Sequence, residues 1–452
     1  MILLIALVGC NDNDNEKNTN ISADFESGSI GDIVKISDTH WELSVRNDNN
    51  NSELPATWRS WWYIRMENIV QNEPIQIRIK NSGWSYYYVP IYSYDQQIWH
   101  HFSEDEVVQN SAHELIINKA YTDDTVWIAR FYPYTFTDLE KYLDTLRGNP
   151  SIDIQIPGYS QRGNPLYLLK ITNFGVPVAS KKRILLHART HPAETPPSFL
   201  LEGLIEYLLS GSQEAINILS TFEFYIFPMH NVDGVMAGNY RSTPQSENLE
   251  LMWFFDINNP LDLVGYVPPE IAILHQYAKR LMSDGGPPVS IAINLHASNS
   301  EPDIRTFFYP HFGTIDQGYE PDESSLWEKQ LRFIDAVANQ HGADLLEPIP
   351  VEGGGSFADK TYPESWWWAN HQDQVMAMTM EMTYGRAGYA PRWIEPDDFR
   401  SLGRSLVLAI PDYYAHPTMV ARPANRASDI LRGVDLKYPE SYPPNAPDEL
   451  KE

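Results

Sequence analysis

Three side chains in this 452-residue chain are of the types that together bind a catalytic metal ion. The stretch R-T-H-P-A-E places His191 and Glu194 three residues apart, and a second histidine, His296, directly follows an apolar run. Two histidines and one carboxylate are a common ligand set of catalytic zinc, which keeps a fourth position for water. These three residues therefore form a candidate zinc site.

Two further residues could supply the rest of a hydrolytic reaction. Glu381 lies near the end of another apolar run, and Arg241 is the last residue of the segment G-N-Y-R. A carboxylate beside an activated water can take its proton, and an arginine can stabilise the oxyanion that develops on an attacked carbonyl. Each of these residues alone is a weak signal, since a lone histidine such as His296 is more often a hydrogen-bonded core residue. Their joint placement favours a hydrolytic centre.

The elements expected to position these residues alternate between strands and helices. Short apolar runs, typical of strands buried on both faces, occupy residues 183–187, 222–227, 289–295 and 375–382. Helical periodicity follows Pro196–Pro197 and Pro269, and recurs over residues 326–337 and 397–409. This alternation predicts an α/β domain with a mixed, largely parallel sheet covered by helices on both faces. Because ligands of such sheets bind outside the carboxyl ends of the strands, the candidate residues lie where a site is expected.

The chain before about residue 135 has another pattern. Its apolar runs are short and rich in aromatic and β-branched residues, and Asn, Gly and Pro separate them. This pattern predicts an antiparallel β-sandwich. Aromatic runs such as Trp61, Trp62 and Tyr63 either fill its core, which is the commoner case, or form a sugar-stacking face.

Charge and the first residues bear on partners and location. Asp and Glu outnumber Lys and Arg by 60 to 33, giving a net charge of −27, so nucleic acid is not an expected partner. The run M-I-L-L-I-A-L-V-G before Cys10 is too short to span a bilayer. With Cys10 it resembles the signal of bacterial lipoproteins, which implies a lipid anchor on Cys10 and a place in the cell envelope, facing the periplasm or exterior. The alternative is a frayed N-terminus with a stray cysteine.

The site motifs resemble those of the zinc carboxypeptidase (funnelin) family, in the same order along the chain. They are H-P-A-E at 191–194, N-V-D-G followed by G-N-Y-R within 231–241, N-L-H at 294–296 and T-M-E at 379–381. The resemblance implies one zinc ion per chain, bound by His191, Glu194 and His296. It also implies that Glu381 is the general base and that Arg241 polarises the scissile carbonyl.

Two further motifs are similar to the cytosolic-carboxypeptidase-like branch, namely F-E-S-G at 25–28 and P-Y-T-x-x-D-L at 133–139. Members of that branch have a β-sandwich before the peptidase domain. We therefore divide the chain into a lipoprotein-type signal with a polar tether, a β-sandwich, a zinc-peptidase-like domain and a Pro-rich acidic tail. Their expected ranges are 1–22, 23–135, 136–416 and 417–452.

One segment departs from the family. Where the family has D-L-N-R-x-W, this chain reads N-L-E-L-M-W, so Glu250 and Leu251 replace the Asn-Arg pair that grips a terminal carboxylate. Neither residue can do the work of a bidentate arginine. Either Arg305 or Arg386 takes over, or the substrate presents no carboxylate there. Tyr362 is the candidate for the tyrosine that closes over substrate in other members, with plain loop packing as the alternative.

Three functions follow as hypotheses. The first is a zinc-dependent, metallocarboxypeptidase-like hydrolase that cleaves an amide bond near a peptide C-terminus and touches the membrane only through its anchor. The second is a zinc amidase on a peptidoglycan stem peptide or a side-chain-linked residue, which Glu250 and Leu251 favour. The third, a binding protein on an inactive peptidase scaffold, is less favoured because the three ligands and the base are all present.

Overall fold

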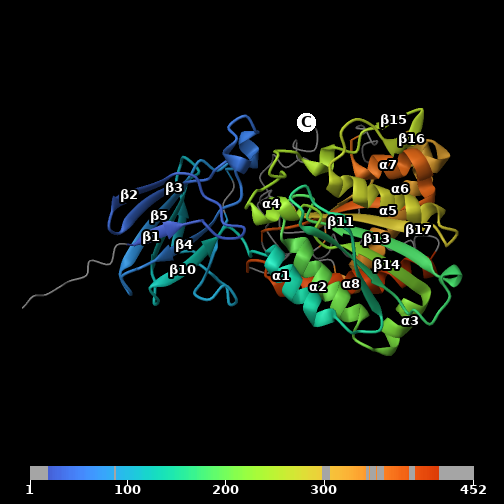
Figure 1. Cartoon of the computed structure of the whole chain (residues 1–452), viewed down its shortest axis with the longest axis horizontal. Coiled ribbons are helices and arrows are strands. Elements are labelled where there is room, and N and C mark those ends of the chain that lie inside the picture. The colour runs from blue at the N-terminus through green and yellow to red at the C-terminus, as the bar shows by residue number, and fades with distance from the viewer. Residues whose placement is uncertain are drawn as a thin grey trace, which may run out of the picture.

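The computed structural model describes residues 19–85, 88–297, 306–342, 346, 353, 361–385 and 392–416. They form a β-sandwich and a larger α/β domain, which lie at opposite ends of the long axis (Figure 1). The last sandwich strand is β10 (Thr125–Ala129), and the first helix of the α/β domain is α1 (Phe136–Leu146). The change of pattern near residue 135 thus coincides with the change from strands to helices.

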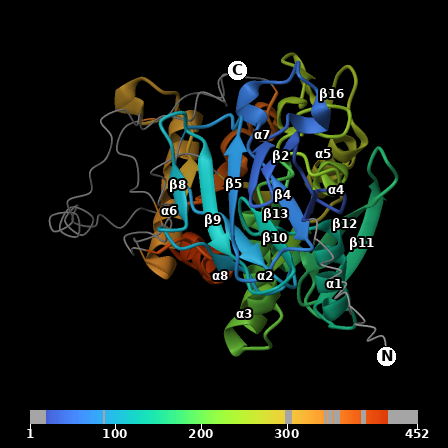
Figure 2. The same ribbon diagram turned by 90° about the vertical axis from the view of Figure 1, so that its left-hand side faces the viewer.

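The β-sandwich has two five-stranded sheets. Their order is β1 (Asn20–Ser22), β4 (Tyr63–Glu67), β10, β6 (Ile91–Ser93), β7 (His100–His101) and β2 (Ile33–Ser37), β3 (His40–Ser44), β5 (Pro74–Lys80), β9 (Leu115–Ala120), β8 (Val107–Gln109). Figure 2 shows β8, β9 and β5 side by side. Among the described pairs, all are antiparallel except β3 with β5.

The structure shows where the aromatic run at residues 61–63 lies and where the sandwich begins. Trp61, Trp62 and Tyr63 are all buried, so this aromatic run fills the core instead of forming an exposed sugar-binding face. Residues 20–22, which the sequence assigns to the polar tether, form β1 because Ile21 is buried and pairs with Met66 of β4. The ordered sandwich therefore starts a few residues earlier than expected.

The α/β domain is built on a seven-stranded mixed sheet. Its order is β11 (Ile152–Tyr159), β12 (Pro165–Ile171), β14 (Phe222–Phe227), β13 (Lys182–Ala188), β17 (Val289–Ala297), β19 (Met376–Met382) and β18 (Phe307–Tyr309). The four central strands β14, β13, β17 and β19 are parallel, whereas the outer pairs are antiparallel. The expected mixed sheet is confirmed, and its parallel part is the part that carries the candidate residues.

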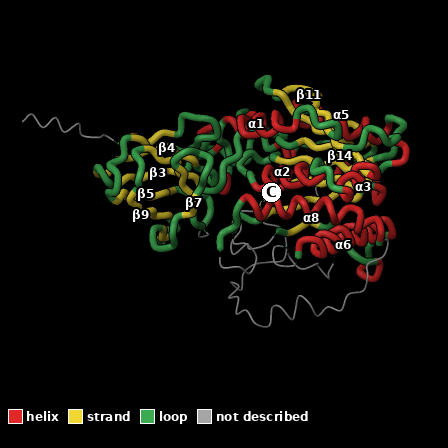
Figure 3. The backbone as a smooth tube through the Cα atoms, turned by 90° about the horizontal axis from the view of Figure 1, so that it is seen from below, coloured by secondary structure: helices red, strands yellow, loops and turns green. Residues whose placement is uncertain are grey.

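Helices cover both faces of this sheet, as expected. Ile184 and Leu186 of β13 pack with α1, α2 (Pro196–Leu208), α3 (Gln213–Thr221), α6 (Pro321–His341) and α8 (Pro396–Ala415). Leu185, between them, packs on the other face with α5 (Pro269–Ser283) and α7 (Pro363–His371). Figure 3 shows α2, α8 and α6 in neighbouring rows. In the described residues, no helix is both long and apolar enough to cross a bilayer.

Two glycines allow α2 and α8 to pack closely. A Cβ atom on Gly203 would collide with the backbone of Arg400, and one on Gly403 would collide with the carbonyl oxygen of Leu200. This close crossing fixes α2, the helix that follows the 191–194 loop, against α8. Short elements of this domain include α4 (Val232–Met236), the 3-10 turn η4 (Leu249–Leu251) and the hairpin of β15 (Phe255–Asp256) and β16 (Asn259–Leu263).

Candidate metal centre and active site

The three predicted metal ligands converge at the carboxyl ends of β13 and β17. One potential ligand atom from each of His191, Glu194 and His296 lies within 4.8 Å of the others, and all three side chains are buried. The Glu194 carboxylate oxygens lie 2.8 Å from the Nδ1 atoms of both histidines, and the two Nδ1 atoms are 3.1 Å apart. Two ring nitrogens and a carboxylate facing one point are the donor set of a zinc site, so the residues fit the metal.

The loop that carries His191 and Glu194 is fixed by the arginine before it. Arg189 adopts a left-handed backbone conformation, with φ of 61°, directly after β13. Its buried guanidinium donates to the carbonyl oxygens of Pro192 and Tyr134 and to the hydroxyl of Ser198. These bonds tie both ends of the loop together, and they compensate for the cost of the unusual backbone geometry.

The outer nitrogens of the two histidines are also held. Nε2 of His191 lies 3.1 Å from Oδ1 of Asn248, and Nε2 of His296 lies 3.2 Å from Oε2 of Glu250. Both ring nitrogens of His296 face carboxylates, with Glu250 at Nε2 and Glu194 at Nδ1. A metal ion bound at Nδ1 would leave the ring proton on Nε2, where Glu250 accepts it. The other oxygen of Glu250 accepts from Nδ2 of Asn294 at 2.9 Å.

Glu250 contacts a candidate metal ligand, because its buried carboxylate lies behind His296. Its predicted role as a substrate-binding residue stays a prediction. Burial lowers the pKa of His296, but Glu250 and Glu194 outweigh burial and raise that pKa well above its ordinary value. The cluster therefore attracts positive charge, as a metal site must.

Glu381 lies beside the metal ligands. In the parallel pair β17–β19 it is directly opposite His296. Burial and the negative charge of Glu194 raise the pKa of Glu381 to about 8, while His296 and Arg241 act in the opposite direction. Burial lowers the pKa of His191, and the charge of Arg241 lowers it further. The five residues predicted to carry the chemistry thus lie together.

Two residues earlier in the same two strands lies a second pair of polar residues. Asn294 of β17 pairs with Thr379 of β19, and the Thr379 hydroxyl donates to the buried Glu364 carboxylate at 2.9 Å. Burial, together with the charge of Glu250, raises the pKa of Glu364 to about 7. Tyr362 is partly buried just before α7, where its carbonyl oxygen accepts from Trp366. Its predicted role stays a prediction. Arg305, Arg386 and Cys10 lie outside the described residues.

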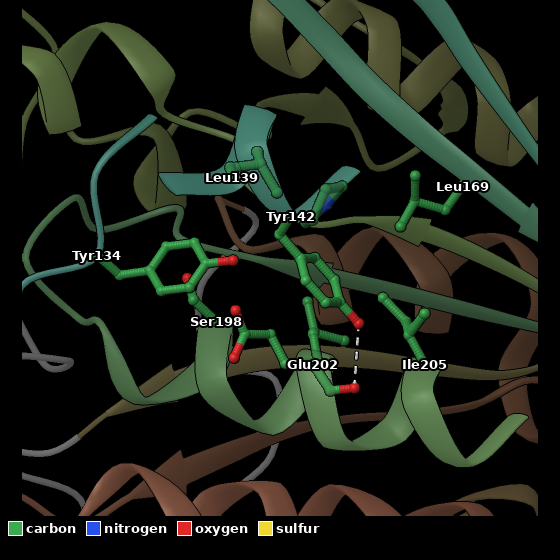
Figure 4. Close-up of a pocket in the computed structure, with 9 residues that line it drawn as sticks. Tyr134, Leu139, Tyr142, Leu169, Ser198, Glu202 and Ile205 are labelled. Carbon is green, nitrogen blue, oxygen red and sulfur yellow. Dashed lines mark hydrogen bonds between the residues drawn. The ribbon is translucent and has the colours of Figure 1, made fainter. Parts of the chain in front are cut away.

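A small pocket beside α1 and α2 is separate from this centre (Figure 4). It is lined by Tyr134, Leu139, Tyr142, Leu169, Ser198, Leu201, Glu202, Ile205 and Pro228. Within it, the Tyr142 hydroxyl donates to the carbonyl oxygen of Glu202 at 3.2 Å. None of these residues belongs to the metal cluster, so we assign the pocket no catalytic role.

Sequence reasoning missed three residues that shape the centre. Asn248 was visible as the first residue of the divergent N-L-E-L-M-W segment, but only Glu250 and Leu251 drew attention. Arg189 precedes the His191 motif by two residues, and a buried arginine gives no signal of its own in a sequence. Asp48 belongs to the sandwich and contacts the backbone of Arg241 from about 190 residues away in the chain. No local pattern marks such a contact.

Comparison with known proteins agrees with this arrangement. Residues 21–131 match the model of the cytosolic carboxypeptidase N-terminal domain, and residues 139–254 match that of zinc carboxypeptidases. Cytosolic carboxypeptidase 2 of Homo sapiens is 31% identical over 253 residues, covering 50% of this chain and 28% of that protein. Cytosolic carboxypeptidase 6 of Caenorhabditis elegans is 27% identical over 351 residues, covering 73% and 71%. The chain thus spans less than a third of the human relative.

Solved structures share the fold. A metallo-carboxypeptidase from Burkholderia cenocepacia superposes with a TM-score of 0.71 at 19% identity, covering 88% of this chain and 99% of that one. The putative carboxypeptidase A from Shewanella denitrificans gives 0.70 at 22% identity, covering 86% and 97%. The same family is indicated by both domain models, by the named relatives and by the His-Glu-His cluster. The chain belongs to the zinc carboxypeptidase family and carries the N-terminal domain of its cytosolic carboxypeptidase branch.

Proposed function

We propose that this chain is a zinc-dependent metallopeptidase that hydrolyses an amide bond near the C-terminus of a peptide or peptide-like substrate, with one zinc ion per chain. The observation that carries the proposal is the convergence of His191, Glu194 and His296 on one point, with Glu381 in the adjacent register position. The fixed ring orientations support it, because both histidines turn Nδ1 inwards.

Each residue has a definite task in this proposal. Zinc, when bound by the three ligands, supplies a Lewis acid that makes water more acidic and polarises a carbonyl. Glu381 accepts the proton of the attacking water and then gives it to the leaving amine nitrogen. Arg241 stabilises the negative charge that develops on the carbonyl oxygen. Asn248 and Glu250 hold the two imidazole rings in the orientation that the metal needs.

The end of the substrate is a separate question. The half-buried Leu251 lies at the position of the family's carboxylate-binding arginine. The neighbouring Glu250 already forms hydrogen bonds with His296 and Asn294. A substrate carboxylate entering here would meet a buried negative charge, which costs several kcal/mol unless a cation compensates. This supports the second candidate function, an amidase on a peptidoglycan stem peptide or a side-chain-linked residue. Arg305 and Arg386 remain the proposed alternatives for carboxylate binding.

Peptide pairs distinguish the two functions. The zinc-loaded chain is incubated with synthetic peptides that differ only in a free or an amidated C-terminus, and products are identified by mass spectrometry. Cleavage of amidated peptides at least as fast as free acids supports the amidase. A preference of more than about tenfold for free acids indicates a carboxylate-binding residue elsewhere. Arg305→Ala and Arg386→Ala then locate it.

The same screen tests the enzyme itself. Hydrolysis must stop on chelation and return with zinc. A chain that binds zinc and hydrolyses nothing in a broad panel of peptides and amides would instead support the third hypothesis, a binding protein on an inactive scaffold.

We also propose that Cys10 is lipidated and anchors the chain to a membrane of the bacterial cell envelope. The L-V-G-C motif and the acidic net charge support a single point of attachment, because the charged domain itself has little affinity for anionic lipid. Cys10→Ser should move the protein from the membrane fraction to the soluble extract. Equal membrane recovery of both forms would contradict the anchor.

A further inference from the structure

We propose that Asp48, a residue of the β-sandwich, is a positioning residue for Arg241. Its carboxylate holds the backbone segment from which the arginine side chain extends towards the metal centre. The inference goes beyond the proposed reaction, because it makes the N-terminal domain part of the catalytic arrangement. It rests on the proposed role of Arg241.

The side-chain hydrogen bonds of Asp48 come from three successive residues of the Arg241 loop. Asp48 lies in the 3-10 turn Asp48–Asn50 after β3 and is 2% exposed. Its Oδ1 accepts from the amide of Tyr240 at 2.6 Å. Its Oδ2 accepts from the amides of Arg241 and Ser242, both at 2.8 Å, and from the Ser242 hydroxyl at 3.0 Å. Both oxygens of the buried carboxylate are therefore engaged by this one loop.

A carboxylate is the side chain that this arrangement requires. Three successive N–H groups that point to one place form an anion-binding concavity, and a carboxylate accepts from all of them. Burial raises the pKa of Asp48, and the hydrogen bonds from Tyr240, Arg241 and Ser242 oppose that rise. An asparagine would turn an NH₂ group towards at least one N–H donor. The backbone at Arg241 would then lose part of its support.

Neighbours of Asp48 hold the flanks of the same loop. Arg46 donates from Nη2 to the carbonyl oxygens of Ala237 and Gly238, at 2.8 and 3.0 Å. Asn49 donates to the carbonyl oxygen of Thr243 at 2.9 Å and accepts from Asn239 at 2.8 Å. These bonds attach the two domains to each other, but none of them touches the peptide groups of residues 240–242. Asp48 alone of the three acts there.

Tyr240 also contacts the loop that carries two of the metal ligands. Its carbonyl oxygen accepts from the amide of Ala193 at 3.1 Å, and Ala193 lies between His191 and Glu194. The Asp48 carboxylate thus supports one peptide that faces the metal-binding loop and the next residue, which carries the arginine. A merely structural contact between domains would give Asp48 and Asn49 equal importance. A positioning role gives Asp48 an effect on turnover that Asn49 lacks.

The test compares Asp48→Asn with Asn49→Gly as a matched control in the whole zinc-loaded chain. Asn49 has a left-handed backbone, with φ of 56°, so glycine removes its side-chain bonds without adding backbone strain. Hydrogen exchange followed by mass spectrometry reports directly on the amides of residues 240–242. Their exchange should accelerate at least about tenfold in Asp48→Asn and remain near the wild-type rate in Asn49→Gly. Unchanged protection in Asp48→Asn would overturn the proposal without any substrate.

Kinetics on a peptide cleaved by the wild type give the functional half of the test. Asp48→Asn should lower kcat by about 10- to 100-fold, with KM within about threefold and zinc content unchanged, because a misplaced Arg241 no longer meets the developing charge. Asn49→Gly should stay within about threefold of wild-type kcat. Equal losses in both variants would reduce Asp48 to a structural contact and overturn the proposal. If Asp48→Asn does not fold, Asp48→Glu replaces it, and wild-type kcat in that variant contradicts the proposal.

A double-mutant cycle shows whether Asp48 acts through Arg241. In an Arg241→Ala background, Asp48→Asn should cost less than about threefold further in kcat. A full additional loss would mean that Asp48 acts by another route. If Arg241→Ala alone keeps wild-type turnover, the proposed role of Arg241 fails. The exchange experiment still decides whether Asp48 holds the loop.

Discussion

The 191–194 loop and the 248–250 segment hold the same two histidines from opposite sides, and they differ in how they are built. The loop follows β13 and is fixed by Arg189, a residue close in sequence. The 248–250 segment reaches the outer ring nitrogens from a distant part of the chain, with an amide on one histidine and a carboxylate on the other. The inner side, where the Nδ1 atoms meet Glu194, is constrained by the ligand chemistry of the metal. The outer side, where the Nε2 atoms meet Asn248 and Glu250, needs only hydrogen-bond acceptors. It is on the outer side that the sequence departs from its family.

The inner side should show the largest effect. His296→Ala removes one of three ligands and leaves Oε2 of the buried Glu250 without its His296 partner, so zinc should be lost and hydrolysis should fall to the chelated level. Zinc is measured by mass spectrometry of metals after desalting. Undiminished zinc in this variant would remove His296 from the site.

The outer side should show a smaller and unequal effect. Glu250→Gln keeps the size of the side chain but removes the charge that orients and strengthens His296, so zinc affinity should fall about 10- to 100-fold. Asn248→Ala removes a neutral acceptor from His191 and from the amide of Glu250, but no charge, and should cost less. Competition with a chromogenic chelator measures both. Equal losses would mean that the charge on Glu250 is of no consequence to the metal.

The same centre should be unstable without metal in a pH-dependent manner. The pKa of Glu381 is raised from 4.5 to about 8 by burial, so the folded chain binds that proton more tightly than the unfolded chain does. This contribution to stability is complete below about pH 4.5 and is lost as pH rises through 8. In chelated protein, Glu381→Gln should therefore gain stability over wild type as the pH rises between these values, by up to about 5 kcal/mol, since one pKa unit corresponds to about 1.4 kcal/mol. Urea unfolding at pH 5 and pH 8 tests it, and a pH-independent difference would contradict an origin in the protonation of Glu381.

The sequence predicted those parts of the molecule that local patterns encode. The strand at 222–227 was placed to the residue, because a continuous apolar run between a helix and a polar loop has one simple interpretation. The three candidate ligands and Glu381 were placed at or just after strand ends, where parallel strands bring them together. The hairpin of β15 and β16 was not predicted, since its length and periodicity give little signal.

Long-range partners were beyond the sequence for a physical reason. Two contacts illustrate this: Glu250 bonds to His296, and Asp48 bonds to the Arg241 backbone. In both cases, the sequence around each residue contains no pattern that predicts the contact. From the sequence, Glu250 was considered only as a substrate-binding residue, because it replaces a substrate-binding residue of the family. Only the packing of the 248–250 segment behind β17 shows that it faces a metal ligand.

The most direct test of the central claim is the turnover of Glu381→Gln measured together with its zinc content. We expect one zinc ion per chain in this variant, as in wild type, because Glu381 is not among the ligands. We also expect a kcat lower by about two to four orders of magnitude, because an amide cannot take the proton of the attacking water. Near-wild-type turnover by a fully zinc-loaded Glu381→Gln protein would contradict the proposed reaction.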